Sequence, residues 1–125
     1  MPIKQITFIL MFIHAACASA YSYQFISEHD GGVDYIDADT VRPLGINTQF
    51  NMATVFTPPQ NLGFTQPVKA IITPTALDCK KVAYFSGVMY AYNEKQELIT
   101  KTTINKWFAI SPTSTMERIF NRYCK

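Results

Sequence analysis

The sequence predicts an α+β fold: an antiparallel β-sheet of about five or six strands, one C-terminal helix, and a disulfide that pins the helix. Short runs rich in β-branched and aromatic residues alternate with turn signals over most of the chain. A helical spacing of apolar residues occurs near the C-terminus. Two cysteines, Cys79 and Cys124, lie downstream of a leader-like segment. Residues 21–125 are therefore expected to form one compact domain.

The first twenty residues are typical of a secretory signal peptide. Lys4 precedes an apolar run at residues 6–13, and the small residues 18–20 supply an A-x-A cleavage site. The apolar run is shorter than the roughly 20 residues that a membrane-spanning helix needs. We expect residues 1–20 to be removed and the mature domain to be exported to the periplasm, the cell surface or the medium.

Cys17 allows a second interpretation of the leader. The sequence His14-Ala15-Ala16-Cys17 resembles the end of a bacterial lipoprotein leader, whose cysteine becomes the lipidated N-terminus. His14 stands where an aliphatic residue is usual, so cleavage after Ala20 is favoured. Lipidation at Cys17 would tether the protein to a membrane through a lipid anchor.

The first half of the mature chain predicts three strands. Residues 23–27 and 33–37 flank a turn that contains two glycines, and are expected to form a β-hairpin. Residues 37–40 predict a turn or one helical turn, because Asp favours both N-caps and Asx-turns. Residues 46–57 are again strand-like. The three prolines and one glycine in residues 57–67 predict an irregular loop.

The second half predicts the rest of the sheet. Residues 68–77 are strand-like, and Pro74 within them indicates an edge strand or a bulged one. Residues 81–92 predict a central strand covered on both sides, because both faces are largely apolar. Residues 98–103 are expected to return antiparallel to it. Residues 104–110 add a short apolar stretch.

The C-terminal segment predicts an amphipathic helix. Ser114 and Glu117 have the spacing of a capping box. The apolar stripe that follows consists of Met116, Ile119, Phe120 and Tyr123. So short a helix is marginal alone and needs the sheet for stability.

The cysteines of the mature domain favour a disulfide between Cys79 and Cys124. An exported domain with two cysteines permits one pairing. The bridge would close a loop of roughly 46 residues, worth about 4 kcal/mol by chain entropy. A pair of metal ligands is the weaker alternative, because no C-x-x-C or paired histidine lies nearby. A catalytic thiol is weaker still, since nothing marks His29 as its partner.

Charge and hydropathy exclude two classes of partner. Loss of Lys4 with the leader leaves the mature domain nearly neutral, without the basic stripe of a nucleic-acid binder. The mature sequence contains no second apolar segment of transmembrane length. We therefore expect no nucleic-acid binding and no membrane span.

The sequence predicts no catalytic, cofactor-binding or metal-binding residues. Asp30, Asp34, Asp37 and Asp39 cluster near His29, but their order does not match an EF-hand loop. Neighbours in the chain seldom have the geometry of a catalytic triad. A solvated turn is therefore favoured over the alternative hypothesis, a small secreted enzyme or metal-binding module that uses His29 and the acids at 30–39.

Two sets of apolar residues are candidates for contact with a partner. The proline-rich loop at residues 58–67 carries Leu62 and Phe64, although Phe64 could equally pack into the core. The aromatic residues Trp107, Tyr84 and Tyr90 could form a binding surface, but such residues are more often packed in the core. Strand alternation places Tyr84 and Tyr90 on the same face.

An ordered set of short motifs resembles the bacterial surface-adhesin E family. The motifs are Tyr35-Ile36-Asp37 with a turn ending at Thr40-Val41, Leu77-Asp78-Cys79-Lys80-x-x-Ala83-Tyr84, Trp107-Phe108-Ala109-Ile110-Ser111-Pro112-x-Ser114, and Tyr123-Cys124. The resemblance spans essentially all of residues 21–125. It implies a small exported domain with an antiparallel sheet, a C-terminal helix, a Cys79–Cys124 disulfide, and Trp107 as a packing landmark.

The resemblance also implies a function. It indicates a non-enzymatic, adhesin-like protein of the cell envelope or surface, acting by protein–protein contact through exposed strand edges or the 58–67 loop. Its expected partner is a host matrix protein or an envelope protein. An accessory subunit of an envelope assembly is a further alternative.

The mature N-terminus is the first testable prediction. Mass spectrometry of the protein purified from its native envelope should show a chain that starts at Tyr21, because residues 18–20 form the better cleavage site. A chain that starts at a lipid-modified Cys17 would contradict this prediction and establish a membrane tether.

Overall fold

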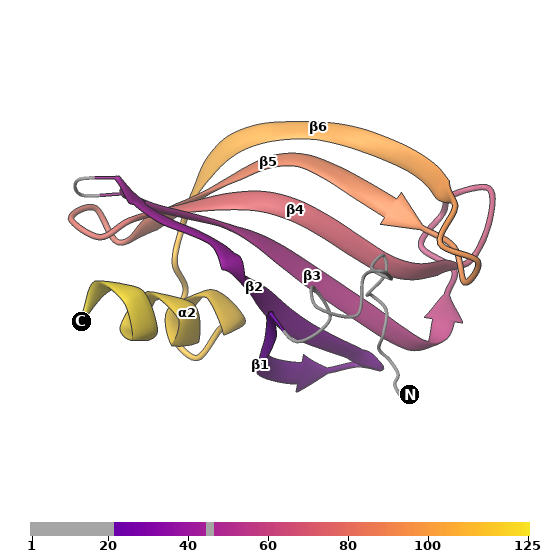
Figure 1. Cartoon of the computed structure of the whole chain (residues 1–125), viewed down its shortest axis with the longest axis horizontal. Coiled ribbons are helices and arrows are strands. Elements are labelled where there is room, and N and C mark those ends of the chain that lie inside the picture. Colours follow the sequence, from indigo (N-terminus) through magenta and orange to yellow (C-terminus); the bar gives the residue numbers. More distant parts are fainter. Residues whose placement is uncertain (1–21, 45–46) are drawn as a thin grey trace.

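The fold is a six-stranded antiparallel sheet with one helix packed against it, as expected from the sequence (Figure 1). The computed structural model describes residues 22–44 and 47–125, so the leader and Cys17 lie outside the described residues. Each strand pairs with the next one in the chain, in the order β1 to β6. The elements are β1 (Tyr23–His29), β2 (Gly32–Leu44), β3 (Asn47–Gln60), β4 (Val68–Asp78), β5 (Ala83–Tyr92), β6 (Leu98–Ala109) and α2 (Thr115–Cys124).

The helix α2 begins at the predicted N-cap. The Ser114 side chain accepts a hydrogen bond from the Glu117 backbone N–H at 3.2 Å. The Glu117 carboxylate reaches one residue further back than in a capping box, and accepts from the backbone N–H of Thr113 at 2.9 Å. The first contact satisfies a backbone donor that the first helical turn leaves unpaired, and the second fixes the residue before the N-cap.

The main core lies between α2 and the first four strands. Each of these strands contributes one deeply buried side chain, and α2 contributes its apolar stripe. The buried members are Ile26, Ile36, Phe50, Leu77, Met116 and Ile119. We call the sheet face that carries them the helix face and the opposite face the open face. A second, smaller cluster of Phe56, Val68 and Ala91 is separate from this core.

The disulfide between Cys79 and Cys124 is confirmed, with the two Cα atoms 5.3 Å apart. It joins the turn between β4 and β5 to the last residue of α2. The same turn is held by Asp78, whose carboxylate accepts from the backbone N–H groups of Lys80 and Lys81 at 3.0 Å each. The covalent link therefore ends in a rigid turn.

The expected turn at residues 37–40 is a bulge instead, and β2 continues through it to Leu44. The pairing of β2 with β3 shifts register between Asp37 and Arg42. Asp37 still makes the local bonds of a turn, accepting from the Asp39 backbone N–H at 3.1 Å and, through its carbonyl, from the Thr40 hydroxyl at 2.7 Å. The hydrogen bonds typical of a turn are therefore present, but pairing with β3 on both sides of the bulge keeps β2 extended.

Two proline predictions also need correction. β3 runs through Pro58 and Pro59 to Gln60, so only residues 61–67 form the loop. Both prolines lie within the register shift between Val55 and Gln60. Their missing N–H groups therefore remove no hydrogen bond from the regular pairing of β3 with β4. Pro74 lies in β4, an interior strand, so the edge-strand alternative is wrong. The bulge alternative holds only in part, since β4 shifts register against β5 at this position but the extra residue lies in β5.

A bulge in β5 separates two tyrosines that alternation places together. Tyr84 pairs with Leu77, a core residue of the helix face, whereas Tyr90 pairs with Ile72. Leu77 and Ile72 lie on opposite faces of β4, which pairs regularly with β3 across both positions. Directly paired residues share a face. Tyr84 therefore lies on the helix face and Tyr90 on the open face, which contradicts the prediction.

We expect the disulfide to supply a large part of the stability. The double variant Cys79→Ser/Cys124→Ser should lower the free energy of unfolding by about 4 kcal/mol, because the crosslink restricts the unfolded chain. Urea denaturation measures the change. The single variant Cys124→Ser serves as the control and should cost about as much. A loss below about 1 kcal/mol in the double variant would show that the crosslink adds little.

Candidate protein-binding surface

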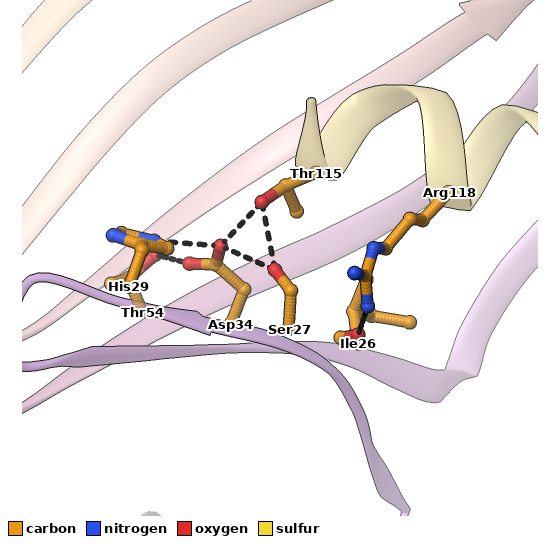
Figure 2. A network of polar contacts seen from close by, with 7 residues as sticks. All are labelled: Ile26, Ser27, His29, Asp34, Thr54, Thr115 and Arg118. Atoms are coloured by element: carbon orange, nitrogen blue, oxygen red, sulfur yellow. Dashed lines mark hydrogen bonds and ion pairs between the residues drawn. The ribbon is translucent and has the colours of Figure 1, made fainter. Parts of the chain in front are cut away.

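The buried carboxylate of Asp34 in β2 accepts four side-chain hydrogen bonds (Figure 2). Its Oδ2 atom accepts from His29 Nε2 at 2.8 Å, Thr115 Oγ1 at 3.1 Å and Ser27 Oγ at 3.3 Å. Its Oδ1 atom accepts from Thr54 Oγ1 at 2.6 Å. The donors come from β1, β3 and α2, so one carboxylate ties the helix to three strands.

The order of these contacts differs from that of a hydrolytic triad. In a triad, histidine stands between the nucleophilic hydroxyl and the carboxylate. Here the carboxylate of Asp34 stands between His29 and the hydroxyls. Ser27 Oγ and Thr115 Oγ1 are themselves 2.7 Å apart. Each hydroxyl has one proton, so the two protons are shared among three contacts: Ser27 with Asp34, Thr115 with Asp34, and Ser27 with Thr115. The arrangement holds hydroxyl groups in place and does not activate one.

The other acids of residues 30–39 do not converge on His29. Asp37 accepts from Ser22 and from the Asp39 backbone, and Asp39 itself is exposed. Asp30 contributes its backbone carbonyl to Gln60. Within residues 22–44 and 47–125, no group of three His, Cys, Asp or Glu side chains could hold a metal ion. The enzyme and metal-module alternatives therefore gain no converging site in this region.

Exposed apolar side chains gather where β5 begins and β6 ends. Trp107 is 49 % exposed, Val82 46 % and Phe108 38 %. Trp107 packs on Phe85 with ring centroids 5.4 Å apart, and Phe108 stacks on Tyr84 at 5.3 Å. We call these five residues the apolar corner.

A family comparison identifies the chain. The family model described as surface-adhesin protein E matches residues 23–125. The chain belongs to the surface-adhesin protein E family.

Solved structures of Haemophilus influenzae protein E share the fold of this family member. Crystal form II of Haemophilus influenzae protein E is 12 % identical in sequence to this chain. Its TM-score is 0.61, and the match covers 82 % of this chain and 87 % of protein E. The selenomethionine form is 10 % identical, with a TM-score of 0.57 over 79 % and 89 %. Protein E from non-typeable Haemophilus influenzae is 12 % identical, with a TM-score of 0.55 over 82 % and 75 %. No curated protein sequence gives a significant match.

Family membership implies a non-enzymatic role, in accord with the order of contacts around Asp34. Homologues in the adhesin E family are surface-exposed proteins, which supports an exported or surface location. None of the helices in the described part of the chain is long and apolar enough to cross a membrane.

In this adhesin E family member, the apolar corner reaches both faces of the sheet. Phe108 pairs with Tyr84 on the helix face, and Trp107 pairs with Phe85 on the open face. Trp107 packs on Phe85 and is 49 % exposed, so it is packed on one side only. Trp107 and Tyr84 also lie on opposite faces, so the predicted aromatic trio does not form one surface.

A cavity of about 310 Å³ adjoins the corner on the helix face. Val82, Ile110 and Phe120 line it together with the disulfide. Val82 has a φ of 54°, which is strained for a β-branched residue. Its carbonyl accepts from the Ile110 backbone N–H at 3.2 Å, and this bond helps to hold the strained turn against the end of β6.

The two predicted loop anchors have different environments in this adhesin. Leu62 is 41 % exposed, whereas Phe64 is partly buried and packs against the second cluster. Leu62 can therefore meet a partner, and Phe64 serves mainly to close the loop onto the sheet.

A separate aromatic group lies on the open face of β1 and β2. Tyr23 and Phe25 both make edge contacts with Tyr35, at 6.4 and 6.5 Å between centroids. Burial, with the nearby charge of Asp37, raises the pKa of Tyr23, and burial also raises the pKa of Tyr35 and of Tyr92. These tyrosines stay neutral at physiological pH and present aromatic surface. Burial likewise lowers the pKa of Lys69.

Sequence reasoning did not identify Val82 or Phe108 as surface residues. A signal was nevertheless present, because Trp107 and Phe108 are consecutive and must point to opposite faces of a strand. On the last strand of a sheet only one face is backed by the helix. At least one of the two rings therefore has to remain exposed.

We expect the Asp34 network to stabilise the fold. Asp34→Ala should lower the free energy of unfolding by about 3 kcal/mol, because it removes the acceptor shared by four donors and leaves the Thr54 hydroxyl and one of the Ser27 and Thr115 hydroxyls without a partner in the network. His29→Ala, the control, should cost at most about 1 kcal/mol, because the imidazole is 47 % exposed. Urea denaturation of both variants compares them. Equal losses would show that the network is not centred on Asp34.

Proposed function

We propose that this adhesin E family member is a non-enzymatic protein of the cell envelope or surface that binds another protein through its apolar corner. One observation carries the proposal: Val82, Trp107 and Phe108 are exposed together at one end of the sheet. Trp107 and Phe108 lie on opposite faces of β6, so a partner contacts both rings by approaching the edge of the sheet. Exposed apolar groups mark interaction sites, and tryptophan is enriched among the residues that dominate binding energy.

Family and fold support the partner class. The chain belongs to an adhesin family and shares its fold with Haemophilus influenzae protein E. A host matrix protein or a protein of the native envelope is the proposed partner. The signal-like sequence of residues 1–20 supports export. Cleavage before Cys17 instead of after Ala20 would give a form tethered to the membrane by a lipid. Leu62, on the loop after β3, is a second proposed contact point.

The apolar corner can be tested by mutation. Trp107→Ser/Phe108→Ser should weaken capture of a partner from a panel of purified matrix proteins and native envelope proteins by at least about tenfold. Circular dichroism should show an unchanged fold, because both rings lie at the sheet edge. Binding is measured by surface plasmon resonance.

Phe25→Ser is the matched control, since Phe25 is 54 % exposed but lies on β1. Leu62→Ser tests the loop without disturbing the second cluster. Undiminished capture by the double variant, with loss in Phe25→Ser, would place the binding surface elsewhere.

A further inference from the structure

The two edge strands of the sheet, β1 and β6, differ in length and in their contacts with α2. β1, one edge, has seven residues and lies beside α2 (Figure 1). Arg118 of α2 donates to the backbone carbonyl of Ile26 at 3.5 Å, and Ile26 is the bulged residue of β1 (Figure 2). Arg122 donates to the Gln24 side chain at 3.5 Å. Arg118 therefore occupies one backbone acceptor of this edge strand, and Arg122 contacts a second of its residues.

β6, the other edge, is open. It spans 12 residues, most of its side chains are exposed, and no strand of the described chain pairs with its outer side. An edge strand presents unpaired backbone N–H and C=O groups that another extended chain can join. A long uncovered edge opposite a covered one is a specific asymmetry of this fold.

The charges on β6 select the chain that can join it. Its ionisable side chains are Lys101 and Lys106, and it carries no acid. Lys101 pairs with Tyr90 and so lies on the open face, while Lys106 pairs with Ser86. Ser86 in turn pairs with Thr75, which lies opposite the core residue Phe50. Lys106 is therefore on the helix face.

Each face of the β6 edge thus presents one cation and one aromatic ring. The open face has Lys101 and Trp107, and the helix face has Lys106 and Phe108. Side chains on an added strand would meet these groups alternately. Acidic and apolar residues on both faces of that strand are the complementary set.

A second copy of this chain is a poor occupant. In the register that pairs two β6 strands antiparallel over their full length, Leu98 lies opposite Ala109 and Lys101 lies opposite Lys106 of the other copy. Like charges directly opposite each other destabilise a strand pair. Lysines on an edge are a recognised device against self-pairing.

We propose that the β6 edge binds an extended acidic segment of a partner protein as a seventh strand, held by backbone pairing, by Lys101 and Lys106, and by the aromatic rings of the apolar corner. This inference specifies the partner chemistry of the proposed binding function and rests on it. It adds that the partner contributes an acidic β-strand and not a folded apolar surface.

Two synthetic peptides test the proposal on the disulfide-bonded mature chain. Both alternate Thr and Val over the length of β6. One carries Glu at the positions that face Lys101 and Lys106 in an antiparallel pairing, and the other carries Lys there. The acidic peptide should bind at least about tenfold more tightly, because opposite charges then face each other. Fluorescence anisotropy at low and high salt measures both affinities.

Charge reversal provides the decisive comparison. Lys101→Glu/Lys106→Glu should invert the preference, so that the lysine peptide binds more tightly. The control Lys80→Glu/Lys81→Glu, in the turn after β4, should keep the original preference. Hydrogen exchange should slow at alternate β6 amides when the acidic peptide binds to the unmodified chain.

The outcomes are distinct. Failure of both peptides to bind at about 1 mM, equal affinities, or unchanged exchange in β6 would each overturn the proposal. A dimer in sedimentation analysis, with slowed exchange at alternate β6 amides in the absence of peptide, would assign the edge to a second copy and also overturn it. Because the peptides replace the natural partner, these results stand apart from partner capture, which tests the binding function itself.

Discussion

The packing of α2 against the first four strands is the interaction on which the rest of the structure depends. A single antiparallel sheet has no second layer of its own, and its apolar face needs a cover. The helix supplies it with Met116, Ile119 and Phe120, which are buried. A ten-residue helix has little stability in isolation, so its two ends are fastened separately. Thr115 bonds to Asp34 at one end, and Cys124 bonds to Cys79 at the other.

The same packing leaves part of the sheet uncovered. The helix lies beside β1, and its arginines contact that strand, whereas Phe108 on the helix face of β6 remains 38 % exposed. The position of α2 on the sheet therefore determines both the buried core and the part of the sheet that remains exposed for the proposed binding. The exposed ring of Phe108 lies on the helix face, which a longer helix would cover further, whereas Trp107 lies on the opposite face.

Much of the architecture could be predicted from local signals. The capping pair Ser114 and Glu117 located the helix, and the two cysteines of the mature chain permitted a single pairing. Strand runs and turns located the six strands in their order. The bulges could not be predicted, because each depends on what the neighbouring strand does at that position. Residues 37–40 show this most clearly, since their local bonds are those of a turn and their path is that of a strand.

The candidate site was harder to predict for the same reason. Asp34 has partners from 20 and 81 residues away, Thr54 and Thr115, and nothing in its own segment signals them. A bulge in β5 interrupts the alternation of side chains between the two faces of the sheet. The faces on which Tyr84 and Tyr90 lie therefore could not be predicted from their spacing in the sequence. Exposure of Trp107 depends on the position of its strand at the edge, which only the completed sheet defines.

The strictly sequential strand order has a consequence for how the domain is made. Each strand of the meander finds its partner in the hairpin just formed, so the sheet can assemble through local contacts with little loop closure. Joining of Cys79 to Cys124 is the long-range step, and Cys124 follows all six strands in the chain. For an exported chain, crosslinking therefore waits until the entire sheet has been translocated. Covalent closure then acts on a chain in which all six strands are already present.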